Sequence, residues 1–296
     1  MARATTLTDK AAAMKHKYRV ESGGSYVPGV TTAMSILDKP ALKWSSSEIA
    51  AKSVVENARR KKTIIKNHRE WLKNSAKGSS AGARKKYVLG CDGTDDEVFI
   101  HWARGEFDRQ WRAKADRGTR VHDIAERWSK GEAVDVLESD AGFVDALEAF
   151  HLECVPSFEL VECVVLNPVH KYGGRFDAIA NLREFDEDGN VIFGRYLIDY
   201  KTGGHYAYEV ATQTAAYAMG RLGVYDDKGN LVGFENLPKL DGARIIYLHE
   251  DGTFKTVNPF EKVSMAGAFK AFLAALDLYR INKSITEQLE IEGDNN

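Results

Sequence analysis

The sequence predicts an α/β protein in which a mixed central sheet is flanked by helices and preceded by a helical elaboration. The order of the elements supports this fold class, because helical patterns fill the first half of the chain and strand patterns cluster after residue 160. The charge also divides the chain. Residues 1–120 carry 25 Lys and Arg against 13 Asp and Glu, whereas residues 121–296 carry 16 against 30. We therefore expect a basic helical N-terminal region over 1–115, part of the core or packed on it, and a core over 116–296.

The first half of the chain carries the helical patterns. The segment 18–37 is expected to form an extended stretch or turn that leads into a short helix, with Thr31 and Thr32 as cap candidates. Apolar residues recur at helical spacing in four later segments. We expect helices over 45–73, 95–115, 118–130 and 140–153. Between the first two, residues 74–93 are rich in Gly, Ser and Lys, which predicts a mobile basic loop.

The second half carries the strand patterns. Three strands are expected first, and the last two are joined by Asp-Glu-Asp-Gly-Asn at 186–190, a composition typical of a hairpin turn. A helix over 208–221 follows, and after two more strands a helix over 261–279 closes the fold before an acidic tail that is expected to fray. The five predicted strands cover 161–166, 174–182, 191–200, 244–248 and 253–257.

Composition excludes several classes of protein. The chain of 296 residues is long enough for a well-filled core, and its three cysteines show no C-x-x-C spacing. A disulfide framework and a structural zinc site are therefore not expected. The sequence contains no apolar run of membrane-spanning length and no apolar segment of a signal peptide near Met1. We expect a soluble cytoplasmic protein without a membrane partner.

Two carboxylates and a lysine are the strongest candidates for chemistry. Asp199 and Lys201 alternate with Tyr200 along one predicted strand, so they point to the same side of the sheet. If the hairpin pairs as its turn suggests, Asp177 on the preceding strand lies close to Asp199. Such oxygen ligands suit Mg²⁺, which can activate water for phosphodiester hydrolysis, and the Tyr200 carbonyl is a further candidate ligand. The alternative is that both aspartates cap turns and Lys201 pairs with one of them at the surface.

Four short motifs occur in the order found in one nuclease family. They are Gly118-Thr-Arg-Val-His122, Gly174-Arg-Phe-Asp177, Asp199-Tyr-Lys201 and Gln213-Thr-Ala-Ala-Tyr217. Together they resemble the G-x-x-x-H, G-x-x-D, D/E-x-K and Q-x-x-x-Y motifs of the RecB-like, lambda-exonuclease-like branch of the PD-(D/E)xK nuclease superfamily, which includes phage-encoded members. The resemblance covers roughly residues 118–217. It implies a restriction-endonuclease-like fold.

The resemblance implies a role for each matching residue. Asp177 and Asp199 would hold the metal, with His122 as a further ligand or a close neighbour, and Lys201 would act on the attacking water. Gln213 and Tyr217, four residues apart on one helix face, would orient DNA or the lysine. Glu162 corresponds loosely to a family glutamate and is a candidate outer ligand. A structural histidine, a structural Gln–Tyr pair and an exposed strand glutamate are the alternatives.

The implied cofactor is Mg²⁺ or Mn²⁺. Members of this branch with an iron–sulfur cluster use one upstream and three downstream cysteines, and no cysteine follows Cys163 here, so no cluster is expected. The separation of 22 residues between Asp177 and Asp199 is long for the family. No G-x-x-x-x-G-K-[ST] phosphate loop is present, so a built-in helicase motor is not expected.

The leading interpretation is a deoxyribonuclease, favoured as an exonuclease that processes duplex ends in recombination or repair. The alternatives are a structure-specific or site-specific endonuclease of the same fold and a non-catalytic DNA-binding module. Expected partners are DNA ends, a single-strand annealing or recombination protein, and further copies of the chain. In a phage-encoded protein the location would be the host cytoplasm. Basic residues expected to contact DNA are Arg59, Arg60, Lys61, Lys62, Arg84, Lys85, Lys86, Arg120 and Arg175.

Overall fold

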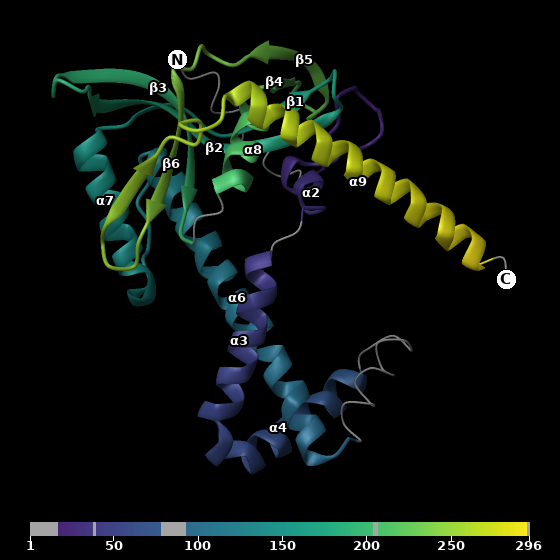
Figure 1. Ribbon diagram of the computed structural model, residues 1–296. Helices are drawn as coiled ribbons and strands as arrows, with labels where there is room; N and C mark the ends of the chain where they lie inside the picture. The colour runs from purple at the N-terminus through teal and green to yellow at the C-terminus, as the bar shows by residue number, and fades with distance from the viewer. Residues whose placement is uncertain (1–16, 38–39, 78–92, 204–206, 295–296) are drawn as a thin grey trace. The chain divides into compact units, whose positions relative to one another are not determined.

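The computed structural model describes residues 17–37, 40–77, 93–203 and 207–294, which fall into two compact units (Figure 1). The larger unit comprises the described residues of Met1–Leu37 and Gly118–Asn296, and the smaller unit those of Asp38–Arg117. The sequence-based boundary near residue 116 lies close to the second of these divisions. Residues 17–37, however, belong with the larger unit rather than with the basic helical region.

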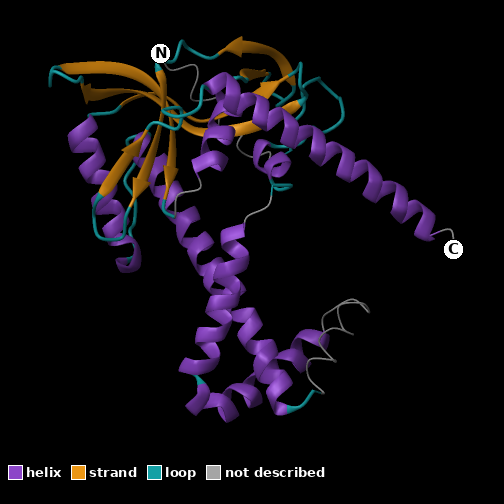
Figure 2. Cartoon of the chain, in the orientation of Figure 1, coloured by secondary structure: helices purple, strands orange, loops and turns teal. Residues whose placement is uncertain are grey.

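A seven-stranded sheet forms the centre of the larger unit (Figure 2). Its order is β5-β4-β1-β2-β3-β6-β7; β3 and β6 run parallel and every other neighbouring pair is antiparallel. The predicted mixed sheet is therefore confirmed. The strands are β1 (Ser157–Asn167), β2 (Tyr172–Phe185), β3 (Val191–Lys201), β4 (Arg221–Tyr225), β5 (Leu231–Asn236), β6 (Gly242–Leu248) and β7 (Phe254–Val257).

Helices cover both faces of this sheet. On one face, the end of α6 (Asp95–Ser129) and α7 (Ala141–Cys154) pack their apolar side chains against β2, β3 and β6, with Phe150 and Ile198 in the same core. On the other face, α2 (Val30–Met34), α8 (Ala207–Ala218) and α9 (Met265–Asp294) enclose a second core that includes Leu197 and Phe272. Ile198 and Leu197 point to opposite faces because strand side chains alternate. The predicted arrangement of helices around a mixed sheet is confirmed.

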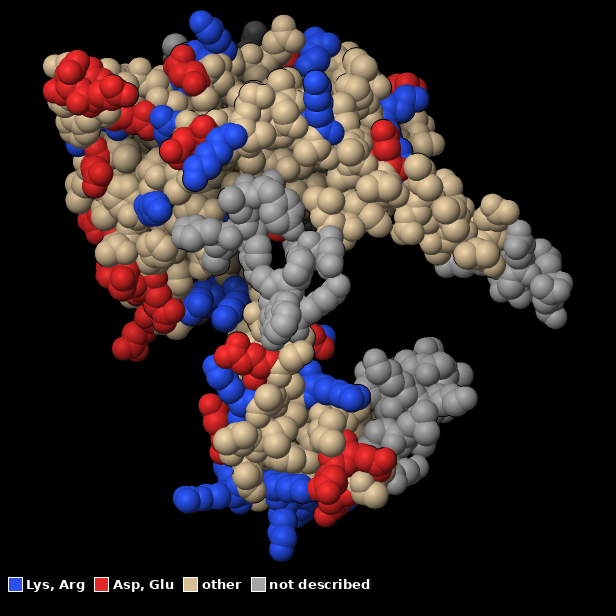
Figure 3. All heavy atoms as spheres, viewed as in Figure 1, with Lys and Arg blue, Asp and Glu red and all other residues tan. Residues whose placement is uncertain are grey.

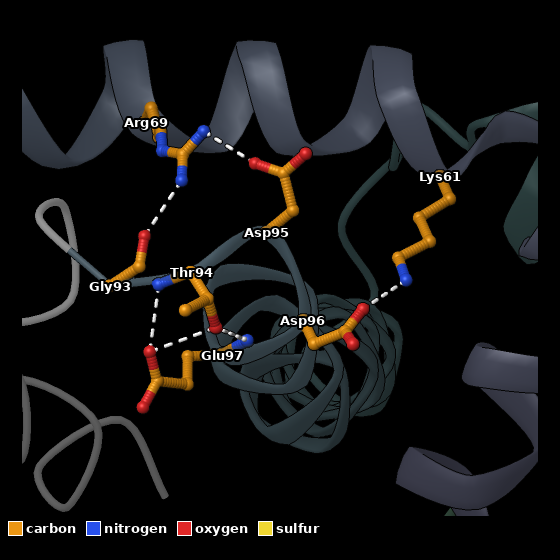
Figure 4. Close-up of polar contacts among 7 residues, drawn as sticks. All are labelled: Lys61, Arg69, Gly93, Thr94, Asp95, Asp96 and Glu97. Carbon is orange, nitrogen blue, oxygen red and sulfur yellow. Dashed lines mark hydrogen bonds and ion pairs between the residues drawn. The ribbon is translucent and has the colours of Figure 1, made fainter.

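The smaller unit is helical. It contains α3 (Pro40–Glu56), the 3-10 turn η1 (Ala58–Arg60), α4 (Lys61–Lys77) and the first part of α6. Thr94 and Glu97 form a reciprocal capping box at the start of α6: the Thr94 N–H donates to Glu97 Oε2 over 2.7 Å, and the Glu97 N–H donates to Thr94 Oγ1 over 3.3 Å (Figure 4). Arg69 then binds Asp95 across 2.7 Å. These contacts fasten α4 to the beginning of α6.

Three predicted helix boundaries were wrong. The expected helix over 45–73 is interrupted by η1 after Asn57, so α3 and α4 are separate helices. The helices expected over 95–115 and 118–130 are one continuous helix of 35 residues, because Gly118 lies inside α6 without ending it. An internal glycine costs a helix only about 1 kcal/mol, which packing of its neighbours outweighs. The final helix continues to Asp294, whereas the sequence predicted fraying after 279.

Strands β4 and β5 were not predicted. They are joined by Asp226-Asp-Lys-Gly-Asn230, which repeats the pattern of the β2–β3 turn at 186–190. In both turns the first aspartate accepts backbone N–H bonds from the third and fifth residues, and the glycine has a positive φ, +81° at Gly189 and +83° at Gly229. The repeated turn sequence is a signal from which the second hairpin could have been found.

The surface carries charge unevenly. Acidic side chains gather at the outer end of the β2–β3 hairpin, and several basic side chains lie at the lower end of the smaller unit as drawn in Figure 3. None of the helices among the described residues combines the length and the apolar character needed to cross a membrane.

Candidate active site

Strands β1 and β2 lose their regular alternation directly opposite each other. Phe176 and Ile179 belong to the same core, although residues an odd number apart on a regular strand face opposite sides. The partner strand is irregular at Glu162, whose φ of +52° is uncommon for a residue other than glycine. The flanking backbone pairs place Glu162 opposite Asp177. The two carboxylates therefore occupy a shared local break in the sheet.

Gly174, the glycine of the G-x-x-D motif, lies where a side chain would meet Tyr217. A Cβ atom at this position would lie 2.5 Å from Cε1 of Tyr217, so a side chain here would displace the tyrosine ring of α8. Tyr217 is buried, and its hydroxyl accepts a hydrogen bond of 2.9 Å from Gln213 Nε2. Burial raises the pKa of Tyr217, and the negative charges of Asp199 and Asp177 add to the effect. The ring remains a neutral phenol beside both carboxylates.

Asp199 and Lys201 form a close ion pair near the end of β3. Lys201 Nζ lies 2.5 Å from Asp199 Oδ2. Burial raises the pKa of Asp199; Lys201 opposes this rise and the charge of Asp177 reinforces it. Burial lowers the pKa of Lys201, but the neighbouring carboxylates outweigh it and the net pKa is raised. Lys201 is consequently a cation at neutral pH.

His122 and Tyr200 both approach one oxygen of Asp177. His122, on α6, places Nδ1 3.5 Å from Asp177 Oδ2. The backbone N–H of Tyr200 donates to the same oxygen over 2.8 Å. The Tyr200 side chain points away, into the core under α7. Sequence reasoning had considered only the Tyr200 carbonyl, as a metal ligand, and had missed its N–H.

Glu162 is tied to Arg175. Arg175 Nε lies 2.6 Å from Glu162 Oε2. Burial, together with the charge of Asp177, nevertheless raises the pKa of Glu162 to about 8. The exposed-strand alternative for Glu162 is wrong, because the residue is buried.

The arginines and lysines expected to contact DNA have different surroundings. Arg120 Nε and Nη2 donate to the two oxygens of the buried Asp140 over 2.7 and 2.9 Å. This bidentate ion pair holds α6 against the start of α7, so Arg120 has a structural role. Lys61 forms an ion pair with Asp96, as Figure 4 shows. Arg84, Lys85 and Lys86 lie outside the described residues.

A cavity of about 440 Å³ opens beside Asp177. Among the described residues, its lining includes Glu126, which sequence reasoning missed. Glu126 lies four residues after His122, so the helical repeat places both on one face of α6, and this spacing could have identified it. The lining residues are Tyr18, Thr31, Gly118, Thr119, His122, Asp123, Glu126, Glu162, Gly174, Arg175, Asp177 and Tyr217.

The chemistry of the donors suits a hard divalent cation. Asp177, Asp199 and Glu162 supply carboxylate oxygens and His122 supplies a ring nitrogen, and the raised pKa values of Asp199 and Glu162 reflect burial of like charges that a cation would relieve. As placed, the described side chains do not make a group of three or more that could hold a metal ion. Lys201 engages Asp199 and Arg175 engages Glu162, so binding would require these cations to move aside.

Comparison with known proteins gives no family assignment. No known protein-family description matches the chain, and no match to it was found among curated proteins.

Proposed function

We propose that this protein is a metal-dependent deoxyribonuclease whose active site is built on Asp177, Asp199 and Lys201. The observation that carries the proposal is that two aspartates and a lysine converge at the end of β3. Lys201 Nζ lies 2.5 Å from Asp199 Oδ2, and the charge of Asp177 raises the pKa of both residues. His122, 3.5 Å from Asp177, adds the fourth member expected from the motif order. A surface turn-cap interpretation does not account for the burial of Asp199.

The residues of the chain have separable tasks in this proposal. Lys201 acts through its charge rather than as a base, because its raised pKa keeps it protonated, and it would stabilise negative charge developing on the phosphate. The Tyr200 N–H fixes the orientation of the Asp177 carboxylate. Gln213 and Tyr217 keep a neutral polar edge beside the carboxylates, where a phosphate can approach without meeting another negative group.

Asp177 and Asp199 would hold Mg²⁺ or Mn²⁺, with His122 and Glu162 completing or bordering the site. A bound ion of this type supplies a Lewis acid for the phosphate and lowers the pKa of water. The protein's part is to hold two carboxylates together: burial raises the pKa of Asp199, and the charge of Asp177 adds to the rise.

The favoured activity is exonucleolytic, on duplex ends. Support for this choice comes from the motif resemblance and not from the geometry of the site. A structure-specific or site-specific endonuclease would use the same residues. The non-catalytic alternative is disfavoured by the burial of Asp199 against Lys201, since placing an ion pair in this way costs desolvation that simple binding does not require.

A plasmid assay tests the proposal and separates its variants. Equal masses of linearised and covalently closed plasmid are incubated with purified protein and Mg²⁺, with and without chelator. We expect progressive loss of the linear form, survival of the closed circle, and no reaction in chelator. Nicking of the closed circle would favour the endonuclease. Absence of hydrolysis of both forms with Mg²⁺ and with Mn²⁺ would contradict the proposed function.

A further inference from the structure

The smaller unit contains a cavity of about 600 Å³ between α4 and α6, separate from the candidate active site. This volume lies within the range of about 300–1,000 Å³ that is usual for ligand sites. Its lining is both aromatic and basic. The lining residues are Asn57, Arg60, Ile64, Asn67, His68, Trp71, Trp102, Gly105, Asp108, Arg109 and Arg112.

Flat rings form one part of the cavity. Trp71 stacks on His68 with ring centroids 5.3 Å apart and planes 11° from parallel, yet Trp71 remains 52% exposed. His68 is held by a hydrogen bond of 2.9 Å between its Nε2 and Nδ1 of His101, and burial lowers the pKa of His68 to about 4, so its ring is uncharged at neutral pH. The stack therefore presents a fixed indole ring with an accessible surface.

Guanidinium groups form the other part. Arg109 is held over the Trp102 ring, 5.3 Å from its centroid, and is also bound to Glu106. Arg60 and Arg112 are exposed, and within the part of the chain that the structure describes their side chains make no ion pair. Among the residues that the structure describes, Asp108 is the single carboxylate residue that lines the cavity. Positive charge therefore predominates around the rings.

We propose that this cavity binds an unpaired nucleobase of single-stranded DNA, with the base stacked on Trp71 and the adjoining phosphates bound by Arg60 and Arg112. Aromatic rings bind unpaired bases by stacking, and guanidinium groups bind phosphates through paired hydrogen bonds. The carboxamide of Asn67 supplies a donor and an acceptor for the edge of a base. Bases within a duplex are already stacked on one another, so the site should discriminate against duplex DNA.

Basic side chains also line the other side of α4. Lys62, Lys66 and Lys73 line a second hollow on α4, together with Arg69, which is bound to Asp95. Side chains at these spacings share one side of a helix. At 100° per residue this row lies about half a turn around α4 from Asn67 and Trp71, so it is a separate basic surface and not a continuation of the cavity. Binding in the cavity uses none of the residues proposed for hydrolysis, so it goes beyond the proposed function and can be tested independently.

The test is DNA binding by the full chain in chelator, where metal-dependent hydrolysis is suppressed. Fluorescence anisotropy is measured with a labelled oligothymidylate and with a duplex of equal length. Trp71→Ala should weaken single-strand binding by about tenfold, the effect of losing one stacked base, and should leave duplex binding nearly unchanged. Trp71→Phe, which keeps a ring against His68, should retain most of the affinity.

Trp111→Ala is the matched control. Trp111 is 43% exposed on α6 and stacks on Phe107, but it does not line the cavity. Its substitution should leave both affinities unchanged. If Trp71→Ala and Trp111→Ala have equal effects, or if Trp71→Ala weakens single-strand and duplex binding equally, the inference is rejected.

Arg112→Gln gives a second test that does not alter the ring stack. Loss of one phosphate contact should reduce the dependence of log affinity on log salt by about 0.7 for a single strand. An unchanged slope would reject the assignment of Arg112. A Trp71-dependent loss of binding in a protein without nuclease activity would retain this inference and reject the proposed function. Nuclease activity in a protein whose single-strand affinity is unchanged by Trp71→Ala, Trp71→Phe and Arg112→Gln would retain the proposed function and reject this inference.

Discussion

The backbone N–H of Tyr200 donates a hydrogen bond of 2.8 Å to Asp177 Oδ2, just beyond the point where the backbone ladder between β2 and β3 ends. The last backbone pair of that ladder is Ala178 with Ile198. The Asp177 side chain thus accepts the Tyr200 N–H in place of a backbone carbonyl of the neighbouring strand. His122 of α6 lies 3.5 Å from the same oxygen, so three elements meet at one carboxylate.

Asp177→Asn removes the charge of this residue but keeps a side-chain oxygen that can accept the Tyr200 hydrogen bond. We therefore expect an unchanged fold. An asparagine has no negative charge, and hydrolysis should fall by on the order of 10²-fold or more. The matched control is Asp188→Asn in the exposed β2–β3 turn, which should be as active as wild type. Initial rates on labelled duplex, with circular dichroism, decide between the outcomes, and near-normal cleavage by Asp177→Asn would remove it from the site.

Lys201→Ala tests the ion pair at the end of β3. Without the lysine, burial and Asp177 would raise the pKa of Asp199 further, so the native state would hold a proton that the unfolded state releases. A carboxyl with a raised native pKa loses stability as pH rises, and we expect the unfolding temperature of the variant, relative to wild type, to fall as pH rises above the ordinary pKa of an aspartate. The loss of stability at pH 8 should be about 1–3 kcal/mol, and hydrolysis should be abolished. Lys255→Ala, an exposed change on β7, is the control; parallel pH profiles for Lys201→Ala and wild type would contradict the account.

Titration of His68 should make the stability of the smaller unit depend on pH. Burial lowers its native pKa to about 4, below its value in an unfolded chain, so the unfolded state binds more protons between these two values. Stability is complete above about pH 6.5 and should decline by on the order of 1–3 kcal/mol as pH falls to 4. His68→Gln should flatten this decline in thermal unfolding, whereas His249→Gln in the larger unit should not. A decline of equal steepness in His68→Gln would assign it to other groups.

The basic residues from Arg59 to Lys62, in η1 and at the start of α4, should differ in how much they contribute to DNA binding. Arg59 and Lys62 are exposed and, within the described residues, make no ion pair, whereas Lys61 is paired with Asp96. If the protein binds duplex DNA, Arg59→Gln with Lys62→Gln should reduce the salt dependence of affinity by about one unit for each lost phosphate contact. Lys61→Gln should leave the slope unchanged. An equal reduction by Lys61→Gln would show that its pair with Asp96 opens on binding.

The sequence predicted five of the seven strands, and the shared side of Asp199 and Lys201, because both depend on local rules. Alternation places residues two apart on the same side of a strand, and the Asp-Glu-Asp-Gly-Asn turn joins β2 to β3 in register. Those two rules explain why the central hairpin agreed with its expectation. The boundary errors at Asn57 and Gly118 arise because tertiary packing decides whether a weak breaking signal ends a helix.

Other features of the site depend on contacts between distant segments. The break in alternation at Asp177 lies opposite Glu162 on the neighbouring strand, and the sequence around either residue does not indicate it. The pairing of Arg120 with Asp140 likewise depends on how α6 meets α7, and the charge of Arg120 alone does not indicate it. The Trp71 cavity joins residues from α4 and α6 that a pattern search on either helix does not connect.

The proposed function requires Asp199 to support metal-dependent hydrolysis of DNA. The most direct measurement is the rate at which wild type and Asp199→Asn release label from an end-labelled linear duplex, each with Mg²⁺ and with chelator. We predict hydrolysis by wild type with Mg²⁺ alone, and a rate for Asp199→Asn lower by on the order of 10²-fold or more, with the same circular dichroism spectrum. Hydrolysis by Asp199→Asn at the wild-type rate, or by wild type in chelator, would contradict the account.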